Sequence, residues 1–144
     1  MCRHFMDGFL FAKNKLFYVI LFFMKAVEYF KNGCSCSESI MKLAIEKGLC
    51  PKEFFPVASA FSGGMSSGCL CGTIAAVQMI SGFNNPEKAR ANAKYIVEEF
   101  KKRNKFTCCR VLSAGFEGMA KKEHCSKYVL DAWEILESVL KVRV

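Results

Sequence analysis

Residues 69–82 read CLCGTIAAVQMISG, a stretch of fourteen residues without a charged side chain. A helix of this composition is apolar on every side, so it has to be buried among other helices. The rest of the chain is rich in Ala, Leu, Met, Glu and Lys, whereas threonine occurs only at Thr73 and Thr107. We therefore expect an all-α fold, a compact single-domain bundle of about six helices in which 69–82 is the central helix.

The length and composition fit one globular domain. The chain has 144 residues, 52% of them hydrophobic and 24% charged, with three prolines. A domain of this size buries about two-thirds of its unfolded surface and needs no disulfide or metal to fold. Disordered, collagen-like and polytopic membrane proteins are excluded. The net charge is +8, but no aromatic-interleaved basic patch accompanies the 101–105 run KKRNK, so we expect no nucleic-acid partner.

The N-terminal segment is apolar but too short to cross a membrane. Its uninterrupted part, Leu16 to Met24, has nine residues where a spanning helix needs about twenty. No small-residue cleavage site follows it, so a signal peptide is not supported. We interpret 1–23 as an apolar extension or extra helix, with a natural start at Met24 as one explanation, and 24–144 as the domain. If ordered, the extension could form a homodimer.

Helix boundary signals divide the domain. Ser35 and Glu38 have the spacing of a capping box, which predicts a helix that begins with Cys36. The remaining signals are a helix end at Asn32-Gly33, starts at Pro51 and at Asn85-Pro86, a short helix from a Thr107 cap to Leu112, and a last long helix after Gly118.

Nine cysteines, an odd number, do not indicate a disulfide framework. In a reducing cytoplasm they point instead to metal binding or thiol chemistry. The close pairs are Cys34-x-Cys36, Cys69-x-Cys71 and Cys108-Cys109, and no C-x-x-C occurs, which disfavours zinc knuckles and thioredoxin-type motifs.

Four cysteines share a position in the predicted helices. Cys36, Cys71 and Cys109 fall in first turns, and Cys125 lies near the start of the last helix. Helix N-termini stabilise anionic sulfur and lower the pKa of a thiol, so four converging starts would form a thiolate site. The alternative is that these cysteines are small core residues, as we expect for Cys50.

Several segments resemble one known family. They are 30–36 (FKNGCSC), 61–65 (FSGGM), 71–76 (CGTIAA), 107–112 and the helix around Cys125. Together, from Met24 onward, they are similar to the redox-active proteins named for a C-GCAxxG-C-C pattern. The family's motif cysteines fall on Cys36, Cys71, Cys109 and Cys125. The chain departs from the pattern in replacing the last glycine by Ala76 and in adding Cys34, Cys69 and Cys108 as possible accessory thiols.

The resemblance implies redox activity in a bacterial or archaeal cytoplasm, with an electron-transfer or membrane-transport protein as partner. Four thiolates are the usual ligands of an iron–sulfur cluster, so we expect the four motif cysteines to bind one for electron transfer. Zinc would use the same donors. Gly72, beside Cys71, would let a backbone or an inorganic sulfide approach closely.

Two other functions remain open at this point. The first is a metal-free thiol–disulfide protein or sensor, in which a low-pKa Cys36 or Cys71 attacks and a neighbouring cysteine resolves. The second is a non-catalytic helical binding or structural protein. We identify no small-molecule substrate and no catalytic residue, so whether the protein is an enzyme stays open. We expect His124, adjacent to Cys125, to be a solvated histidine that is poorly placed to form a Cys–His pair.

Overall fold

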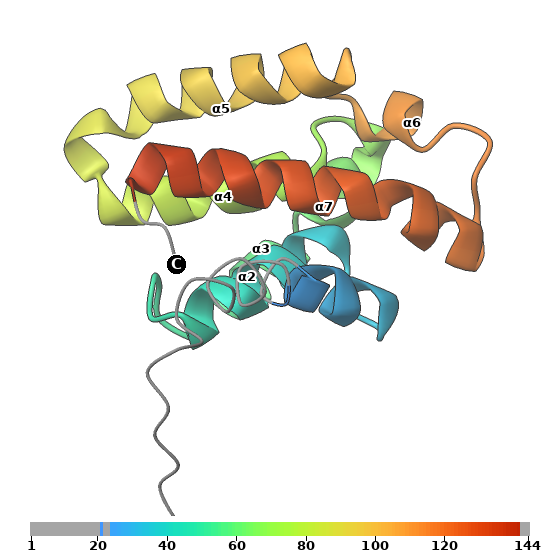
Figure 1. Ribbon diagram of the computed structural model, residues 1–144, viewed down its shortest axis with the longest axis horizontal. Coiled ribbons are helices and arrows are strands. Elements are labelled where there is room, and N and C mark those ends of the chain that lie inside the picture. The colour runs from blue at the N-terminus through green and yellow to red at the C-terminus, as the bar shows by residue number, and fades with distance from the viewer. Residues whose placement is uncertain (1–20, 22–23, 142–144) are drawn as a thin grey trace, which may run out of the picture.

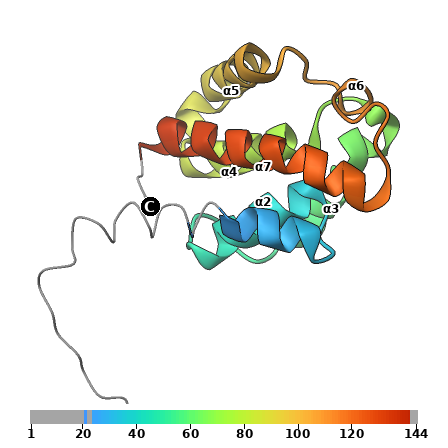
Figure 2. The same ribbon diagram turned by 45° about the vertical axis from the view of Figure 1, so that its right-hand side comes forward.

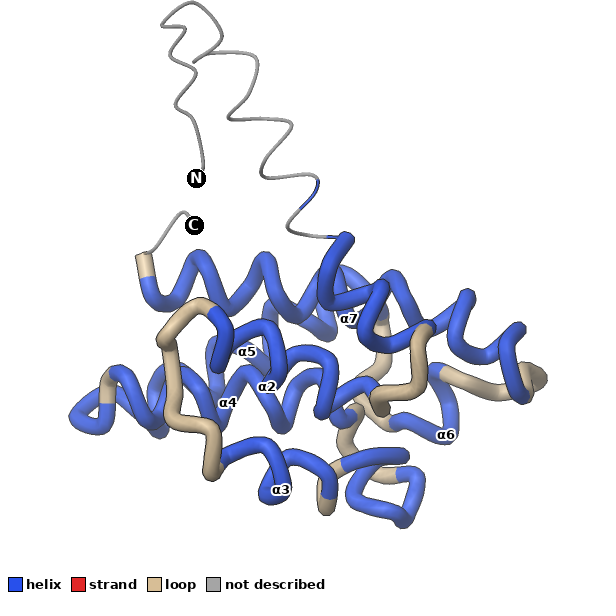
Figure 3. The backbone as a smooth tube through the Cα atoms, turned by 90° about the horizontal axis from the view of Figure 1, so that it is seen from below, coloured by secondary structure: helices blue, strands red, loops and turns tan. Residues whose placement is uncertain are grey.

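The computed structural model describes residue 21 and residues 24–141, and within them the predicted all-α fold is confirmed. Helices joined by short loops make up this part of the chain, and no strand occurs in it (Figure 3). Its only β-type pairing is an isolated antiparallel bridge between Leu70 and Cys108. The predictions for 1–20 and 22–23, including the homodimer contact, lie outside the described residues. No helix in the described part is long and apolar enough to cross a membrane.

The central helix is α4, Gly72–Asn84. It packs against α2 (Cys36–Glu46), α5 (Ala89–Asn104) and α7 (Gly118–Leu140). Figures 1 and 2 show α5 above the α4 and α7 pair, with α2 and α3 below it. Four apolar side chains of α4 are completely buried: Ile74, Ala76, Val77 and Ile80. The charge-free sequence therefore does mark the centre of the bundle.

The central helix begins at Gly72 rather than at Cys69 as predicted. Residues 69–71 are instead extended alongside the segment that leads into α6 (Cys109–Leu112). The Cys71 N–H donates to Thr107 O at 2.8 Å, and the Cys109 N–H donates to Cys69 O. These bonds pin two cysteine-bearing segments side by side. Thr107 is consequently not the cap of α6, because Cys108 occupies that position.

Two other helix starts also differ from the sequence prediction. Pro51 opens a turn, in which the Phe54 N–H donates to Pro51 O, and α3 (Phe54–Ser59) follows it. Pro86 begins a 3-10 helix, η2 (Pro86–Lys88), before α5. By contrast, the capping box is present as predicted, with Ser35 accepting from the Glu38 N–H and the Glu38 carboxylate accepting from the Ser35 N–H.

A tight turn stands next to α6 at one end of the bundle. This turn, η1 (Gly64–Gly68), contains Met65 and Ser66 with φ of 57° and 53°. Gly63 and Gly64 before them also have positive φ, 62° and 64°. A left-handed conformation costs a non-glycine residue about 1–2 kcal/mol. The surrounding packing must therefore hold this turn in place.

Candidate functional site: a cysteine-lined pocket

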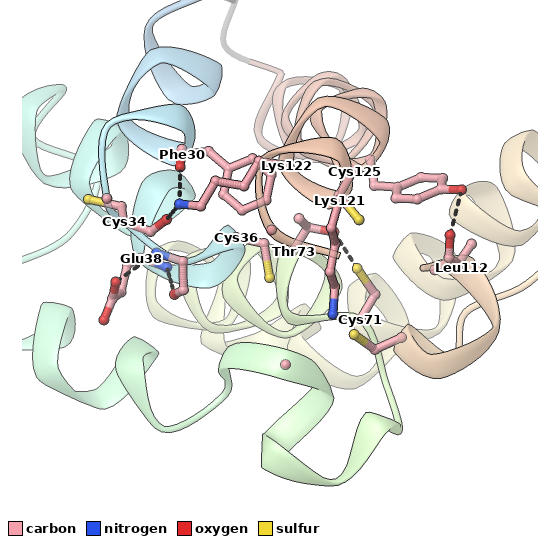
Figure 4. Close-up of a pocket in the computed structure, with 16 residues that line it drawn as sticks. Phe30, Cys34, Cys36, Glu38, Cys71, Thr73, Leu112, Lys121, Lys122 and Cys125 are labelled. Carbon is pink, nitrogen blue, oxygen red and sulfur yellow. Dashed lines mark hydrogen bonds between the residues drawn. The ribbon is translucent and has the colours of Figure 1, made fainter. Parts of the chain in front are cut away.

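A pocket of about 380 Å³ lies where the starts of α2, α4 and α6 meet the side of α7. All four cysteines singled out by helix position line it: Cys36, Cys71, Cys109 and Cys125. Figure 4 shows the labelled sulfurs of Cys36, Cys71 and Cys125 facing one another across the cavity. Cysteines far apart in the sequence therefore share one space.

Cys36 is the first residue of α2, held there by the capping box. The backbone N–H groups of Gly63 and Ser37 donate hydrogen bonds to its sulfur. Burial, together with the nearby Cys71 and Cys109 sulfurs, outweighs these bonds and raises the pKa of Cys36 to about 12. The Ser37 hydroxyl donates to Ala58 O at 2.8 Å, which ties this turn of α2 to α3. Cys36 therefore sits protonated in a fixed position.

Cys71 immediately precedes α4 and is 5% exposed. Its sulfur is hydrogen-bonded to Thr73 Oγ1 at 3.2 Å. It also accepts hydrogen bonds from the backbone N–H groups of Thr73 and Ile74. Desolvation nevertheless raises the pKa of this thiol. A low pKa at Cys36 or Cys71 was expected from the helix N-termini, and the structure corrects it because burial is the larger effect.

Cys125 does not lie near a helix start. It is in the third turn of α7, which begins at Gly118, so only three of the four cysteines stand at helix N-termini. Desolvation and the neighbouring Cys71 raise its pKa to about 11, while Lys121 acts in the opposite direction. The start of α7 lies where the sequence predicted it, but Cys125 follows Gly118 by seven residues, which places this cysteine two turns into the helix. The cysteine nonetheless faces the pocket.

Cys109 opens α6 and is half-buried. The backbone of η1 packs directly on it, because a Cβ atom on Gly64 would be 2.6 Å from Cys109 Cβ. The residue at position 64 must therefore be glycine for two reasons, the close contact and the positive φ. The left-handed turn and the cysteine fit together as one unit.

The accessory residues differ in their places. Cys34 lines the pocket, but its sulfur points away from the other labelled sulfurs in Figure 4. Cys69 is exposed, and the Cys108 thiol donates to Gly68 O at 2.9 Å; neither lines the pocket. At Gly72 a Cβ atom would be 2.8 Å from Cys36 Sγ and 2.9 Å from Phe61 O, so the close neighbours are this chain's own backbone and sulfur.

The sequence analysis missed two lysines and one threonine at the site. Lys121 and Lys122 precede Cys125 by four and three residues and line the pocket with it. Residues at these spacings share a helix face, so helical periodicity was the signal that could have identified them. Lys122 donates to the carbonyl oxygens of Phe30 and Cys34. Thr73, two residues after Cys71, carried no such signal.

His124 is not the solvated residue that we expected. Its ring stacks on Phe116 with centroids 3.9 Å apart, and its Nε2 lies 2.8 Å from Leu112 O. His124 does not line the cysteine pocket, so the structure gives no Cys–His pair with Cys125. Its role is to pack α7 against the end of α6.

The pocket does not offer the geometry of a single-ion site. Among residue 21 and residues 24–141, no group of three or more His, Cys, Asp or Glu side chains is arranged to hold one metal ion. A cluster of several irons spreads its thiolate ligands farther apart than a single ion does. The donors that are present are four sulfurs around one cavity, and soft sulfur donors are the ligand type of both iron–sulfur clusters and zinc.

Comparison with known proteins identifies the family. No curated protein and no solved structure matches the chain. Residues 34–139 match the family described as "Putative redox-active protein (C_GCAxxG_C_C)". The matched range includes the four pocket cysteines and most of the described helices. Because the match covers well over half of the sequence, the chain belongs to the C_GCAxxG_C_C family of redox-active proteins.

Proposed function

We propose that this redox-active protein transfers electrons through an iron–sulfur cluster bound by Cys36, Cys71, Cys109 and Cys125. The observation that carries the proposal is that these four cysteines, three in different helices and one directly before a fourth, line one pocket. Four thiolates are the standard ligand set of such clusters. When bound, the cluster supplies one-electron chemistry, and the protein supplies its position and surroundings.

The surroundings of the sulfurs suit that role. Backbone N–H groups of Gly63 and Ser37 are directed at the Cys36 sulfur, and those of Thr73 and Ile74 at the Cys71 sulfur. Hydrogen bonds to sulfur and exclusion of water are two of the means by which proteins set cluster reduction potentials. The hydrogen bonds are made by the folded chain itself, and burial shields the Cys71 sulfur from solvent.

The raised pKa values make ligation a proton-releasing process. Cys36, Cys71 and Cys125 are protonated at neutral pH, because burial raises the pKa of each thiol. A thiol must lose its proton to bind iron, so cluster assembly would be favoured by higher pH. The same protonation makes these thiols slow nucleophiles, which weighs against exchange chemistry at Cys36 or Cys71.

Anaerobic purification followed by iron and sulfide analysis tests the cluster. We expect iron and acid-labile sulfide in the wild-type protein, and their loss in Cys71→Ser. Cys50→Ser is the matched control, since Cys50 is buried near Met41 but outside the pocket. A colourless protein that lacks both elements even after reconstitution would exclude the cluster. Zinc in its place would show the same ligands with a different metal.

A thiol–disulfide function has one specific observation in its favour. The register of the Leu70 and Cys108 bridge sets Cys69 opposite Cys109, and the Cys109 N–H donates to Cys69 O. Cys69 is exposed, whereas Cys109 lines the pocket. When the Cys69 and Cys109 thiols form a disulfide, the two S–H bonds break and two electrons and two protons pass to a dithiol-oxidising reagent such as diamide, which joins a pocket cysteine to an exposed one. Diamide treatment of metal-free protein with mass-spectrometric mapping tests it: without this pair in the map, the thiol function loses its support.

Two further elements complete the proposal. The first is the location. The eight described cysteines are all free thiols, the state that a reducing compartment maintains, so we propose that the protein is cytoplasmic. A net charge of +8 favours association with an acidic surface, so an electron-transfer or membrane-transport protein with such a surface is the proposed partner. Loss of the association at high salt would be expected.

A further inference from the structure

An open polar groove of about 750 Å³ adjoins the cysteine pocket. Gly63, Cys109 and Lys121 line both hollows, so the groove and the pocket meet at a shared wall. The volume lies in the range typical of small-molecule sites. Anything bound in this groove would lie beside Cys109, one of the four pocket cysteines.

The charged side chains of the groove favour an anion. It is lined by two cations, Arg110 and Lys121, and by a single carboxylate, that of Glu117. One Arg110 N–H donates to Ser67 O at 3.0 Å. The same side chain packs on Gly68, where a Cβ atom would be 3.1 Å from Arg110 Nε. The guanidinium is therefore held in place while most of its five N–H donors are left over.

Lys121 contrasts with its neighbour Lys122. The Lys122 ammonium donates hydrogen bonds to the carbonyl oxygens of Phe30 and Cys34. Within residues 24–141, the Lys121 ammonium forms neither a hydrogen bond nor an ion pair, although Glu117 is one turn away. Figure 4 shows the Lys121 side chain running into the cavity near the labelled cysteines. A cation held between two hollows without an anionic partner is ready to receive one.

The left-handed turn forms another wall of the groove. Gly63, Ser66 and Gly68 line it, and Ser66 adopts its positive φ without the freedom of glycine. Strained backbone of this kind persists where the surroundings over-determine it, and such residues cluster at ligand sites. The turn adds hydroxyl groups to the lining through Ser66 and Ser67.

We propose that this groove binds a small anion, a molecule that carries a carboxylate or an oxyanion, between Arg110 and Lys121 and beside Cys109. The inference deepens the proposed redox function by naming the chemical class of its small reactant. It makes no use of the cluster itself, because the groove is formed by the folded chain. The positive net charge would further concentrate anions at the protein.

Two alkylating reagents, one anionic and one neutral, test the proposal. Iodoacetate is an anion and iodoacetamide is neutral, but both react with the same thiolate. In chelator-treated protein at low salt, rates of modification at each cysteine are measured by mass spectrometry. The ratio of the iodoacetate rate to the iodoacetamide rate cancels any difference in thiol pKa. We expect this ratio to be about tenfold higher at Cys109 than at Cys69, which is exposed and outside the groove.

Three variants decide which cations are responsible. Arg110→Gln and Lys121→Gln should each lower the ratio at Cys109 toward that at Cys69. Lys122→Gln removes the same charge from the adjacent residue, which lines the pocket but not the groove, and should leave the ratio unchanged. Equal ratios at Cys109 and Cys69, or an equal effect of all three variants, would overturn the proposal.

Inorganic phosphate supplies a readout that needs no thiol reaction. Phosphorus NMR should show line broadening of phosphate by the wild-type protein and by Lys122→Gln, but not by Lys121→Gln. Unbroadened phosphate with all three proteins would contradict anion binding. Iron and sulfide analysis is a separate measurement, so a protein without a cluster that still binds phosphate would reject the proposed function and keep the groove.

Discussion

Gly72 and Cys36 approach so closely that a Cβ atom on Gly72 would lie 2.8 Å from Cys36 Sγ. The first turn of the central helix α4 is thus packed against the first turn of α2, with no room for a methyl group between them. The glycine that follows Cys71 is therefore a spacing requirement, because it allows two of the three cysteine-bearing helix starts to meet.

Gly72→Ala should destabilise the protein by about 1–3 kcal/mol, the usual cost of forcing extra volume into a packed core. The added methyl would also press on Phe61 O at 2.9 Å and move Cys36 from its position. Chemical unfolding measures the stability, and iron analysis measures the site. Gly82→Ala is the control in the same helix, since its Cβ would meet Ala89 Cβ at an ordinary 3.7 Å. That variant should be neutral or slightly stabilising.

Serine at Cys36, Cys71, Cys109 or Cys125 should remove most of the bound iron while leaving the helical circular dichroism intact. A hydroxyl is a poor ligand for iron in such a site, but it fits the space of a thiol. Cys50→Ser should cost about 1–3 kcal/mol of stability without loss of iron. Retention of iron by any of the four pocket variants would remove that cysteine from the ligand set.

The metal-free protein should lose stability as the pH rises above about 9. The Cys36 thiol has an ordinary pKa of 9.0 when unfolded and about 12 when folded. Between these values the unfolded chain has released a proton that the folded protein still holds, so the free energy of unfolding falls with pH. The slope from one such thiol is at most about 1.4 kcal/mol per pH unit.

Urea unfolding at pH 7, 9 and 10 measures this slope. Cys36→Ala removes the titrating group, so its stability should depend less on pH than that of the wild type. An identical slope in both proteins would show that Cys36 does not hold its proton more tightly in the folded state.

Lys122→Met should destabilise the protein by about 1.5–3 kcal/mol, the range for hydrogen bonds made by a charged group. Its ammonium joins α7 to the end of the helical segment 24–31 through Phe30 O, and to the following turn through Cys34 O. Lys127→Met is the comparison on the same helix, because the Lys127 side chain is 59% exposed where it bonds to Asp131 and Asn104, and pairs made by an exposed lysine contribute little. A difference below about 0.5 kcal/mol between the two variants would contradict this role for Lys122.

The sequence predicted the elements of the fold well because the decisive signals were local. The charge-free run identified the central helix, and the Ser35 and Glu38 spacing identified the start of α2 to the residue. The start of α4 was misplaced because the Cys71 N–H bonds to Thr107 O, and no local pattern shows a pairing between segments so far apart.

The site was less predictable than the fold. The position of Cys36 at a helix N-terminus was correctly identified, but its acidity was misjudged. Proximity to a helix dipole can be read from a sequence, whereas the extent of desolvation depends on how the finished bundle packs. Lys121 and its groove likewise depend on the approach of η1 to α6, two elements that are distant in the sequence.

The last of the four cysteines has a consequence for how the protein is made. Cys36, Cys71 and Cys109 precede or open their helices, while Cys125 is carried within α7, the final described helix. During synthesis, three of the four cysteines therefore leave the ribosome before α7, the helix that completes their pocket. Whatever loads the site must wait until α7 has been synthesised, and a protein interrupted before α7 would expose three thiols that the folded domain keeps together.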